Sequence, residues 1–169
     1  MALLNAISSG CSCEAIEALL DEREAANEAR HDDDWLALAY AAKDLRVLSL
    51  LLDRGFGVDT LDRKGRPVIF AAVKLGNVDV VDLLLDRGAR LDITSPADKW
   101  TVLHEAVEAV PVNRAVVESI LRRPVNVDAV HRIKLRTPLH YAAMYGHTAI
   151  VRMLLEAGAK VDPPDYRTT

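Results

Sequence analysis

The stretch from Arg136 to Ala159, RTPLHYAAMYGHTAIVRMLLEAGA, holds residue types that an active site uses. His140 and His147 lie close to Tyr141 and Tyr145, with threonines beside them. Imidazole and phenol groups exchange protons with substrates, and a hydroxyl beside such a base can act as a nucleophile. However, no set of nucleophile, base and orienting carboxylate emerges from the spacing of these residues. The histidines therefore call for a structural interpretation beside the chemical one.

Cys11 and Cys13 are the only two cysteines in the chain. Neighbours this close in a helical region form a poor disulfide, and no third cysteine is present to pair with either. A C-x-C pair is half of some metal sites, but no histidine lies nearby in the sequence. We therefore predict no metal, no cofactor and two small thiols that are buried or half-buried. Unpaired thiols favour an intracellular location, cytoplasmic or nuclear.

The composition favours closely packed helices in a chain long enough to bury its own core. Of the 169 residues 50% are hydrophobic but only 5% are aromatic, so alanine, leucine and valine supply the apolar surface. The formal net charge of −4 argues against a protein that coats nucleic acid. The first twenty residues lack the basic start of a signal peptide, and no apolar run is long enough to span a bilayer. We expect no membrane segment.

Five apolar pairs recur along the chain at a nearly constant interval. They are Leu19-Leu20, Leu51-Leu52, Leu84-Leu85, Ile120-Leu121 and Leu154-Leu155. The second members of these pairs stand 32, 33, 36 and 34 residues apart. An interval of about 20–50 residues is typical of repeat proteins, in which each repeat is one supersecondary unit.

A glycine follows the apolar pattern in three of these units. Gly55, Gly88 and Gly158 stand just after a predicted helix, where only glycine takes a positive φ without a steric penalty. Pro124 occupies the corresponding place in a fourth unit, so that helix must end differently. A shorter, alanine-containing helical pattern precedes each apolar segment, as in VIFAAVKL. Each unit is therefore predicted to be a helix pair that buries its apolar face only by stacking on its neighbours.

The last of these units carries the most specific motif. Its parts are Thr137-Pro138-Leu139-His140, Ala142-Ala143, Gly146-His147, Leu154-Leu155 and Gly158-Ala159. Together they closely resemble an ankyrin repeat, in which T-P-L-H-x-A recurs about every 33 residues. Thr101-Val102-Leu103-His104 is a partial second copy. The resemblance implies an all-α solenoid of stacked antiparallel helix pairs with protruding hairpin loops, about five units including a degenerate N-terminal cap.

The resemblance covers nearly the whole chain, which we interpret as a single array. The predicted segments are a cap-like helix pair and charged linker (1–33), three repeats (34–66, 67–100 and 101–136), and a fourth repeat with the start of a further hairpin (137–169). The composition of residues 21–33 favours helix, ending near Asp32–Asp34. Two extra residues and Pro111 predict a bulged turn between the helices of the third repeat.

The same resemblance assigns structural roles to the residues first considered as chemistry. In ankyrin repeats the threonine begins the first helix, the proline occupies its first turn, and the histidine ties helix to loop. We interpret seven residues as parts of this motif: Thr101, His104, Thr137, Pro138, His140, Gly146 and His147. We predict no catalytic residue and no enzyme activity.

By resemblance, ankyrin arrays bind other proteins on a concave surface made of hairpin tips and first helices. The predicted hairpins 61–66, 94–100 and 130–136 carry charges of +2, 0 and +3, so the remainder must carry −9 to give the net −4. Basic rows with neighbouring aromatic residues favour acidic protein partners. The predicted partner contacts are Arg63, Lys64, Arg66, Lys74, Lys99, Trp100, Arg132, Lys134, Arg136, Met144 and Tyr145.

Three other functions fit parts of the sequence. An enzyme or small-ligand site in the inner groove would use His131, Tyr145 and His147. The basic hairpins suit anions, but too few aromatic residues accompany them to favour nucleic acid. Finally, the last helix pair lacks the polar outer face of a terminal cap, so self-association through the C-terminal repeat is a further alternative. Trp100 has its own alternative, as packing beneath its hairpin.

Overall fold

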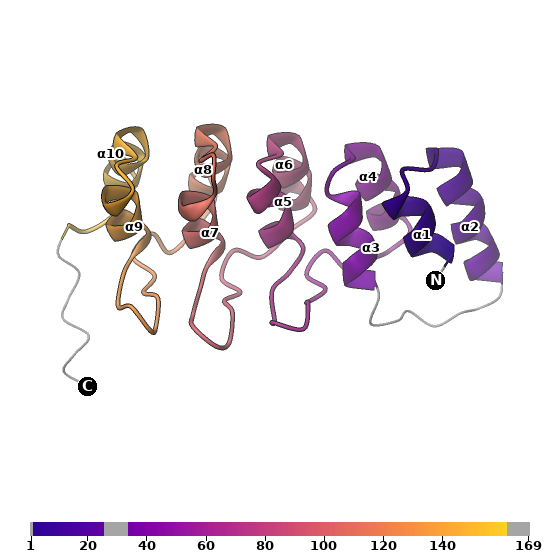
Figure 1. Cartoon of the computed structure of the whole chain (residues 1–169), viewed down its shortest axis with the longest axis horizontal. Helices are drawn as coiled ribbons and strands as arrows, with labels where there is room; N and C mark the ends of the chain where they lie inside the picture. Colours follow the sequence, from indigo (N-terminus) through magenta and orange to yellow (C-terminus); the bar gives the residue numbers. More distant parts are fainter. Residues whose placement is uncertain (1, 26–33, 162–169) are drawn as a thin grey trace. The chain divides into compact units, whose positions relative to one another are not determined.

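The computed structural model of the protein describes residues 2–25 and 34–161. Ten helices form within these ranges (Figure 1): α1 (Ala2–Ser8), α2 (Cys13–Ala25), α3 (Asp34–Ala41), α4 (Leu45–Asp53), α5 (Ile69–Leu75), α6 (Val78–Asp86), α7 (Val102–Glu108), α8 (Arg114–Leu121), α9 (Pro138–Met144) and α10 (Thr148–Glu156). The described ranges contain only isolated β-bridges and no longer strand. The predicted all-α class is confirmed. The C-terminal part of the predicted linker helix and the further hairpin lie outside the described residues.

The chain divides into two compact units, Met1–Ala89 and Arg90–Thr169. In the first unit α1 packs on α2 and α3, α4 packs on α2, α3 and α6, and α5 packs on α6. In the second unit α7 packs on α8 and α9, and α10 packs on α8 and α9. Each unit therefore buries apolar faces by pairing successive helices and by stacking one pair on the next, as the repeat interval predicts.

Short polar side chains begin most of the second helices of the pairs. Asp44 Oδ1 accepts the Arg46 backbone N–H at 2.9 Å, and Asn113 Oδ1 accepts that of Ala115 at 3.0 Å. Asn77 caps α6 in the same way. These bonds satisfy N–H groups that the first helical turn leaves without a carbonyl partner.

Left-handed glycines follow three of these helices. Gly55, Gly88 and Gly158 have φ values of 80°, 86° and 90°, which confirms the predicted C-caps. In contrast, α8 ends at Arg122 in the right-handed helical region, and its N–H donates to the Glu118 carbonyl. This is the helix that Pro124 follows.

The apolar pairs form the centre of each unit. Leu51, Leu84, Ile120 and Leu154 are completely buried, and they are the first members of their pairs. In the N-terminal pair the more buried residue is the second one, Leu20. Leu85 is also buried, at 7% exposure, so every pair places at least one member on the apolar stripe of its helix.

The turn between α7 and α8 is longer than its counterparts. Ala109–Asn113 connects these helices, whereas Tyr145–His147 connects α9 to α10. Val110 in the longer turn is 94% exposed. The predicted bulge in this repeat is therefore present.

Candidate functional site

Four ring-bearing side chains of the second unit form a buried cluster: Trp100, His104, His131 and Tyr141. The Trp100 ring stacks on His104 with centroids 4.8 Å apart. Its ring meets those of His131 and Tyr141 nearly edge-on, at 5.0 and 5.3 Å. His104 and Tyr141 belong to α7 and α9, and the other two residues belong to the hairpins that precede these helices. The cluster therefore fixes two hairpins onto two helices.

His104 joins its own helix to the following hairpin. Its Nδ1 accepts the Thr101 backbone N–H at 3.3 Å and lies 2.8 Å from Thr101 Oγ1. Because Nδ1 accepts, Nε2 carries the proton and donates to the Arg136 carbonyl oxygen at 3.2 Å. Both ring nitrogens are thus used in holding the backbone.

Three other polar atoms of the cluster also have partners. Trp100 Nε1 donates to Glu105 Oε2 at 2.8 Å. His131 Nδ1 and the Tyr141 hydroxyl are 2.8 Å apart. Such pairs satisfy polar groups that would otherwise be buried at a large cost in free energy.

Burial makes His104 a weak base. Desolvation lowers the pKa of its imidazole from 6.5 to about 4, although the Arg136 carbonyl and Asp98 act in the opposite direction. A neutral imidazole with no exposed surface cannot exchange protons with a substrate. The chemistry of this cluster is therefore structural.

Two residues named from the sequence belong to this cluster instead of a surface. Trp100 is only 9% exposed, so it is not the displayed contact predicted for it; the alternative, packing beneath its hairpin, is what the structure shows. His131, which an inner-groove enzyme would use, is only 6% exposed. Neither residue is presented to a ligand.

The last repeat carries the same threonine–histidine arrangement. Thr137 Oγ1 lies 2.8 Å from His140 Nδ1, and Pro138 occupies the first turn of α9. His140 is exposed, unlike His104. Gly146 ends α9 with a φ of 72°, and the half-buried His147 ring lies 5.8 Å from that of Tyr145. The Thr137 hydroxyl beside His140 is completely buried and caps α9.

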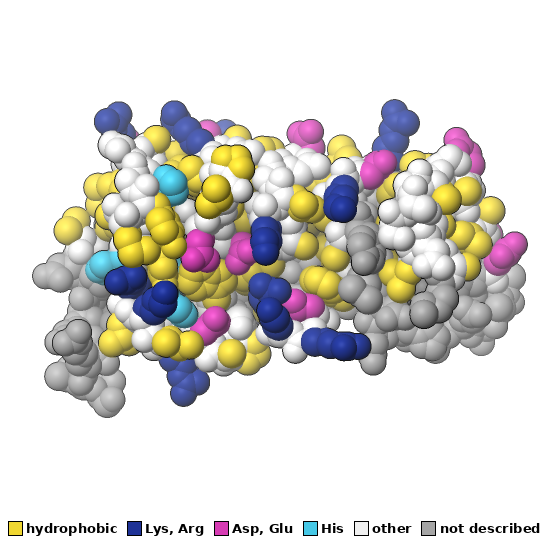
Figure 2. Space-filling view, viewed as in Figure 1, with side chains coloured by type: hydrophobic (Ala, Val, Ile, Leu, Met, Phe, Trp, Pro, Cys, Tyr) yellow, Lys and Arg dark blue, Asp and Glu magenta, His cyan; other side chains and the backbone are white. Residues whose placement is uncertain are grey.

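The hairpin before α9 exposes a run of alternating side chains. Arg132, Ile133, Lys134 and Leu135 are all exposed. Figure 2 shows basic and hydrophobic side chains together on the surface below α7 and α9, where Figure 1 places the two hairpins of this unit. The hairpins are joined directly, because the Arg132 backbone N–H donates to the Asp98 carbonyl at 2.7 Å. Exposed Lys99 follows Asp98.

Arg136, Met144 and Tyr145 lie along the start and end of α9. The Arg136 guanidinium is 6.0 Å from the Tyr141 ring centroid, and its Nη1 is 3.1 Å from Met144 Sδ. Met144 and Tyr145 are 49% and 43% exposed. The Tyr145 hydroxyl donates to Glu108 Oε1 at 3.2 Å, and desolvation together with this carboxylate raises the pKa of the phenol.

In the first unit the remaining predicted contacts lie on the hairpin 61–66 and on α5. Arg63 and Lys64 are exposed, as is Lys74 on α5. Arg66 donates from Nε and Nη2 to Asp62 Oδ2 at 3.2 and 3.1 Å, so its charge is partly neutralised within the hairpin. The eleven predicted partner contacts are thus divided: four belong to the first unit and seven to the second.

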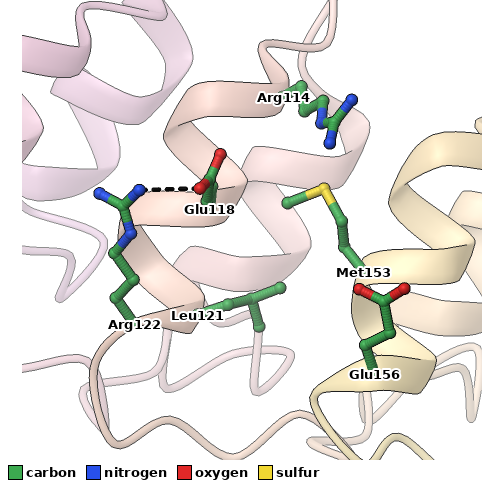
Figure 3. A pocket seen from close by; sticks show the side chains of 6 residues that line it. All are labelled: Arg114, Glu118, Leu121, Arg122, Met153 and Glu156. Carbon is green, nitrogen blue, oxygen red and sulfur yellow. Dashed lines mark hydrogen bonds and ion pairs between the residues drawn. The ribbon is translucent and has the colours of Figure 1, made fainter.

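An open pocket lies on the second helices of the second unit (Figure 3). Its lining comes from α8 and α10: Arg114, Glu118, Leu121, Arg122, Met153 and Glu156. Arg122 Nη2 and Glu118 Oε1 form an ion pair of 2.7 Å across its edge. The pocket is shallow and of mixed character, and it has no concave apolar interior to hold a small molecule.

Other chemistry finds no support in the described residues. They contain no cluster of three or more His, Cys, Asp or Glu side chains that suits a metal ion. Cys11 is exposed and Cys13 partly exposed, and both thiols are free, so the expected burial is wrong for Cys11. Among the described residues no helix has the length and apolar character needed to cross a membrane.

The sequence interpretation missed two exposed aliphatic side chains at the hairpin tip. Ile133 is 72% exposed and Leu135 is 45% exposed. Leu135 and Lys99 also have positive φ values, 51° and 60°. The sequence did contain a signal for these two backbone conformations, because Lys99 and Leu135 stand where the first hairpin has Gly65.

Comparisons with known proteins agree with this architecture. The family model described as "Ankyrin repeats (3 copies)" matches residues 3–95 and 87–165. The chain is similar to ankyrin repeat, SAM and basic leucine zipper domain-containing protein 1 of Ornithorhynchus anatinus, with 37% identity over 126 residues, 73% of this chain and 26% of the relative. The homologous protein of Dasypus novemcinctus is 34% identical over 125 residues, 72% of this chain and 26% of the relative. The chain thus spans about a quarter of the length of these curated relatives.

A solved structure shows the same fold. The ankyrin repeat domain of Bcl-3, described as a unique member of the IkappaB protein family, superposes with a TM-score of 0.82 and 26% sequence identity. The alignment covers 95% of this chain and 73% of that domain's chain.

Proposed function

This chain belongs to the ankyrin repeat family, and from that premise we propose that it is a non-catalytic module that binds an acidic protein through its hairpins and first helices. Ankyrin repeats generally mediate protein–protein interaction. Their shape suits this role, because stacked repeats offer a long surface and few deep cavities.

The single observation that supports an acidic partner is the set of free cations on the hairpins. Five exposed side chains there form no ion pair with a described residue: Arg63, Lys64, Lys99, Arg132 and Lys134. Basic groups left unpaired in the free protein are available to carboxylates of a partner, and they accelerate the encounter with it.

Charge reversal at the hairpins tests this proposal. The partner is first identified by crosslinking and mass spectrometry, and its affinity is then measured with purified components. We expect the triple variant Arg63→Glu, Arg132→Glu and Lys134→Glu to lose most of that affinity. Arg66 and Arg136 are left unchanged because they contact Asp62 and Tyr141 within the fold.

A matched variant controls for net charge. Arg46→Glu, Arg114→Glu and Arg152→Glu places the same three reversals on α4, α8 and α10, and it should bind the partner normally. Circular dichroism of both variants should match that of the wild type. If the hairpin variant binds as tightly as the wild type, the proposed surface is wrong. Tight binding of duplex DNA or RNA, with a steep dependence on salt, would favour nucleic acid as the ligand instead.

Self-association is a second candidate, supported by the surface of the C-terminal helix pair. Leu155 on α10 is 42% exposed and Val161 beyond it is 76% exposed. Light scattering over a wide concentration range would show a rising mass that Leu155→Glu abolishes. A constant monomer mass would contradict this candidate without affecting the first.

A further inference from the structure

We propose that the second unit displays Lys99 and Leu135 to its partner from two strained hairpin positions, and that the segment they bind carries both carboxylates and aliphatic side chains. This inference rests on the proposed function, because it names the chemistry of the partner that the hairpins bind. It draws on a backbone feature that the basic charge alone does not explain.

Gly65, Lys99 and Leu135 occupy the same position in their three hairpins. In each hairpin the residue that follows accepts the closing backbone hydrogen bond through its carbonyl oxygen. These bonds run from Asp62 to Arg66 at 2.9 Å, from Ser95 to Trp100 at 3.0 Å and from His131 to Arg136 at 2.9 Å. The Lys99 and Leu135 N–H groups also donate to the carbonyls of Ser95 and His131, each four residues earlier.

All three residues have left-handed backbone conformations. The φ values are 72° at Gly65, 60° at Lys99 and 51° at Leu135. Glycine adopts this region freely, whereas a residue with a Cβ atom is strained there. Among the described residues, Lys99 and Leu135 are the two that have a positive φ without being glycine.

Backbone hydrogen bonds hold both residues in this conformation, but their side chains gain little from the fold. Leu135 is 45% exposed, so its side chain gains only part of the free energy of burial. Lys99 is exposed and forms no ion pair with a described residue. Backbone strain that the fold itself does not use is often found at functional sites.

The surroundings of the two positions define what they bind. Ile133 is 72% exposed, and Arg132 and Lys134 flank it. The bond from the Arg132 N–H to the Asp98 carbonyl brings Lys99 and its hairpin next to this run. Cations and aliphatic groups therefore share one small surface.

Only one kind of partner satisfies both sets of groups. An apolar segment would bury Lys99, Arg132 and Lys134 without a counter-charge, which is unfavourable. A segment with acidic but no apolar groups would leave Ile133 and Leu135 in water. Because cations and aliphatic side chains lie together on the turn from Arg132 to Leu135, a complementary segment carries both carboxylates and aliphatic side chains.

Binding of defined peptides tests the chemistry. The probe is a fluorescein-labelled twelve-residue peptide of alternating glutamate and valine, and binding to the full chain is followed by fluorescence anisotropy. One control peptide replaces every valine with serine and keeps the charge; another replaces every glutamate with lysine and keeps the valines. We expect the probe to bind about tenfold more tightly than either control. Equal affinity for the serine control, or no binding of the probe, would overturn the inference.

Substitutions at Leu135 distinguish a role of its side chain in binding from a role in folding. Leu135→Gly and Leu135→Ala both remove the side chain, so both should weaken probe binding about tenfold. Only glycine also relieves the strain, so Leu135→Gly should raise the melting temperature by about 2–4 °C relative to Leu135→Ala. Lys99→Gly should raise the melting temperature by a similar amount relative to the wild type, and it should weaken probe binding about threefold.

The outcomes also distinguish this inference from the proposed function. If Leu135→Gly melts at a higher temperature but binds the probe and the partner as the wild type does, the inference fails. If Leu135→Gly melts at a lower temperature than Leu135→Ala, the strain argument fails. In either case the proposed function stands as long as the hairpin charge reversal still abolishes partner binding.

Discussion

Burial gives His104 a measurable effect on the pH dependence of stability. Its pKa is about 4 in the folded protein, against 6.5 for an ordinary histidine. Between these pH values the unfolded chain binds a proton that the folded chain does not, so stability falls as the pH falls from about 6.5 towards about 4. The full loss attributable to this residue is about 3 kcal/mol.

Replacing His104 should therefore flatten this part of the pH profile. We expect His104→Gln to be less stable than the wild type at pH 7, because its stacking on Trp100 is lost. Its free energy of unfolding should nevertheless change less between pH 7 and pH 4.5. Urea denaturation at both pH values measures this difference. His140→Gln is the control, since His140 has the same bonds to its threonine but is exposed; a steep His104→Gln profile would contradict the prediction.

Thr137 offers a second prediction at the scale of one residue. Its hydroxyl is completely buried and lies 2.8 Å from His140 Nδ1 while also accepting the His140 N–H at 3.4 Å. Thr137→Ala removes this helix cap and should lower the free energy of unfolding by about 1–2 kcal/mol in urea denaturation. Thr137→Ser keeps the hydroxyl and should lower it by much less. Equal losses in the two variants would show that the threonine methyl, not the cap, is what matters.

At the scale of helices, polar side chains cap the N-termini and left-handed glycines follow the C-termini. Gly88 follows α6 with a φ of 86°, and a Cβ atom there would meet no atom within 4 Å. Substitution is therefore opposed by backbone strain alone. Gly88→Ala should lower the free energy of unfolding by about 1 kcal/mol, and Gly88→Asn by less, because asparagine tolerates this region better. Thermal melts of both variants decide the matter, and an alanine variant as stable as the wild type would contradict the argument.

The helices could be predicted from the sequence because their signals are local. An apolar stripe such as that of Leu84, a polar cap such as Asn77 and a glycine such as Gly88 each act within one or two turns. The same holds for the threonine–histidine motif. These elements are where sequence and structure agree.

The candidate surface was less predictable because exposure depends on distant parts of the chain. Trp100 looked like a displayed anchor, yet it is covered by His104, His131 and Tyr141, which come from three other segments. No local pattern shows whether such a ring points outward. Ile133, at the tip of the hairpin before α9, was not predicted as a contact because charged residues flank it on both sides and dominate the local pattern.

The distribution of charge is a property of the whole molecule. The three hairpin segments carry +5 in a chain whose net charge is −4. If the hairpins attract an acidic partner, the association rate constant depends on local charge more than on the net charge, and it falls as salt screens the attraction. Stopped-flow fluorescence with the glutamate–valine peptide should show about a tenfold slower association at roughly 300 mM than at roughly 20 mM salt, with little change in dissociation.

Two variants of equal charge distinguish local attraction from net charge. Arg132→Gln with Lys134→Gln removes two positive charges from a hairpin, whereas Arg114→Gln with Arg152→Gln removes two from α8 and α10 of the same unit. A local effect makes the first variant associate several-fold more slowly and nearly without salt dependence, while the second behaves as the wild type. If both variants slow association equally, the net charge governs the encounter, because a uniform long-range field does not depend on where in the unit the charges lie.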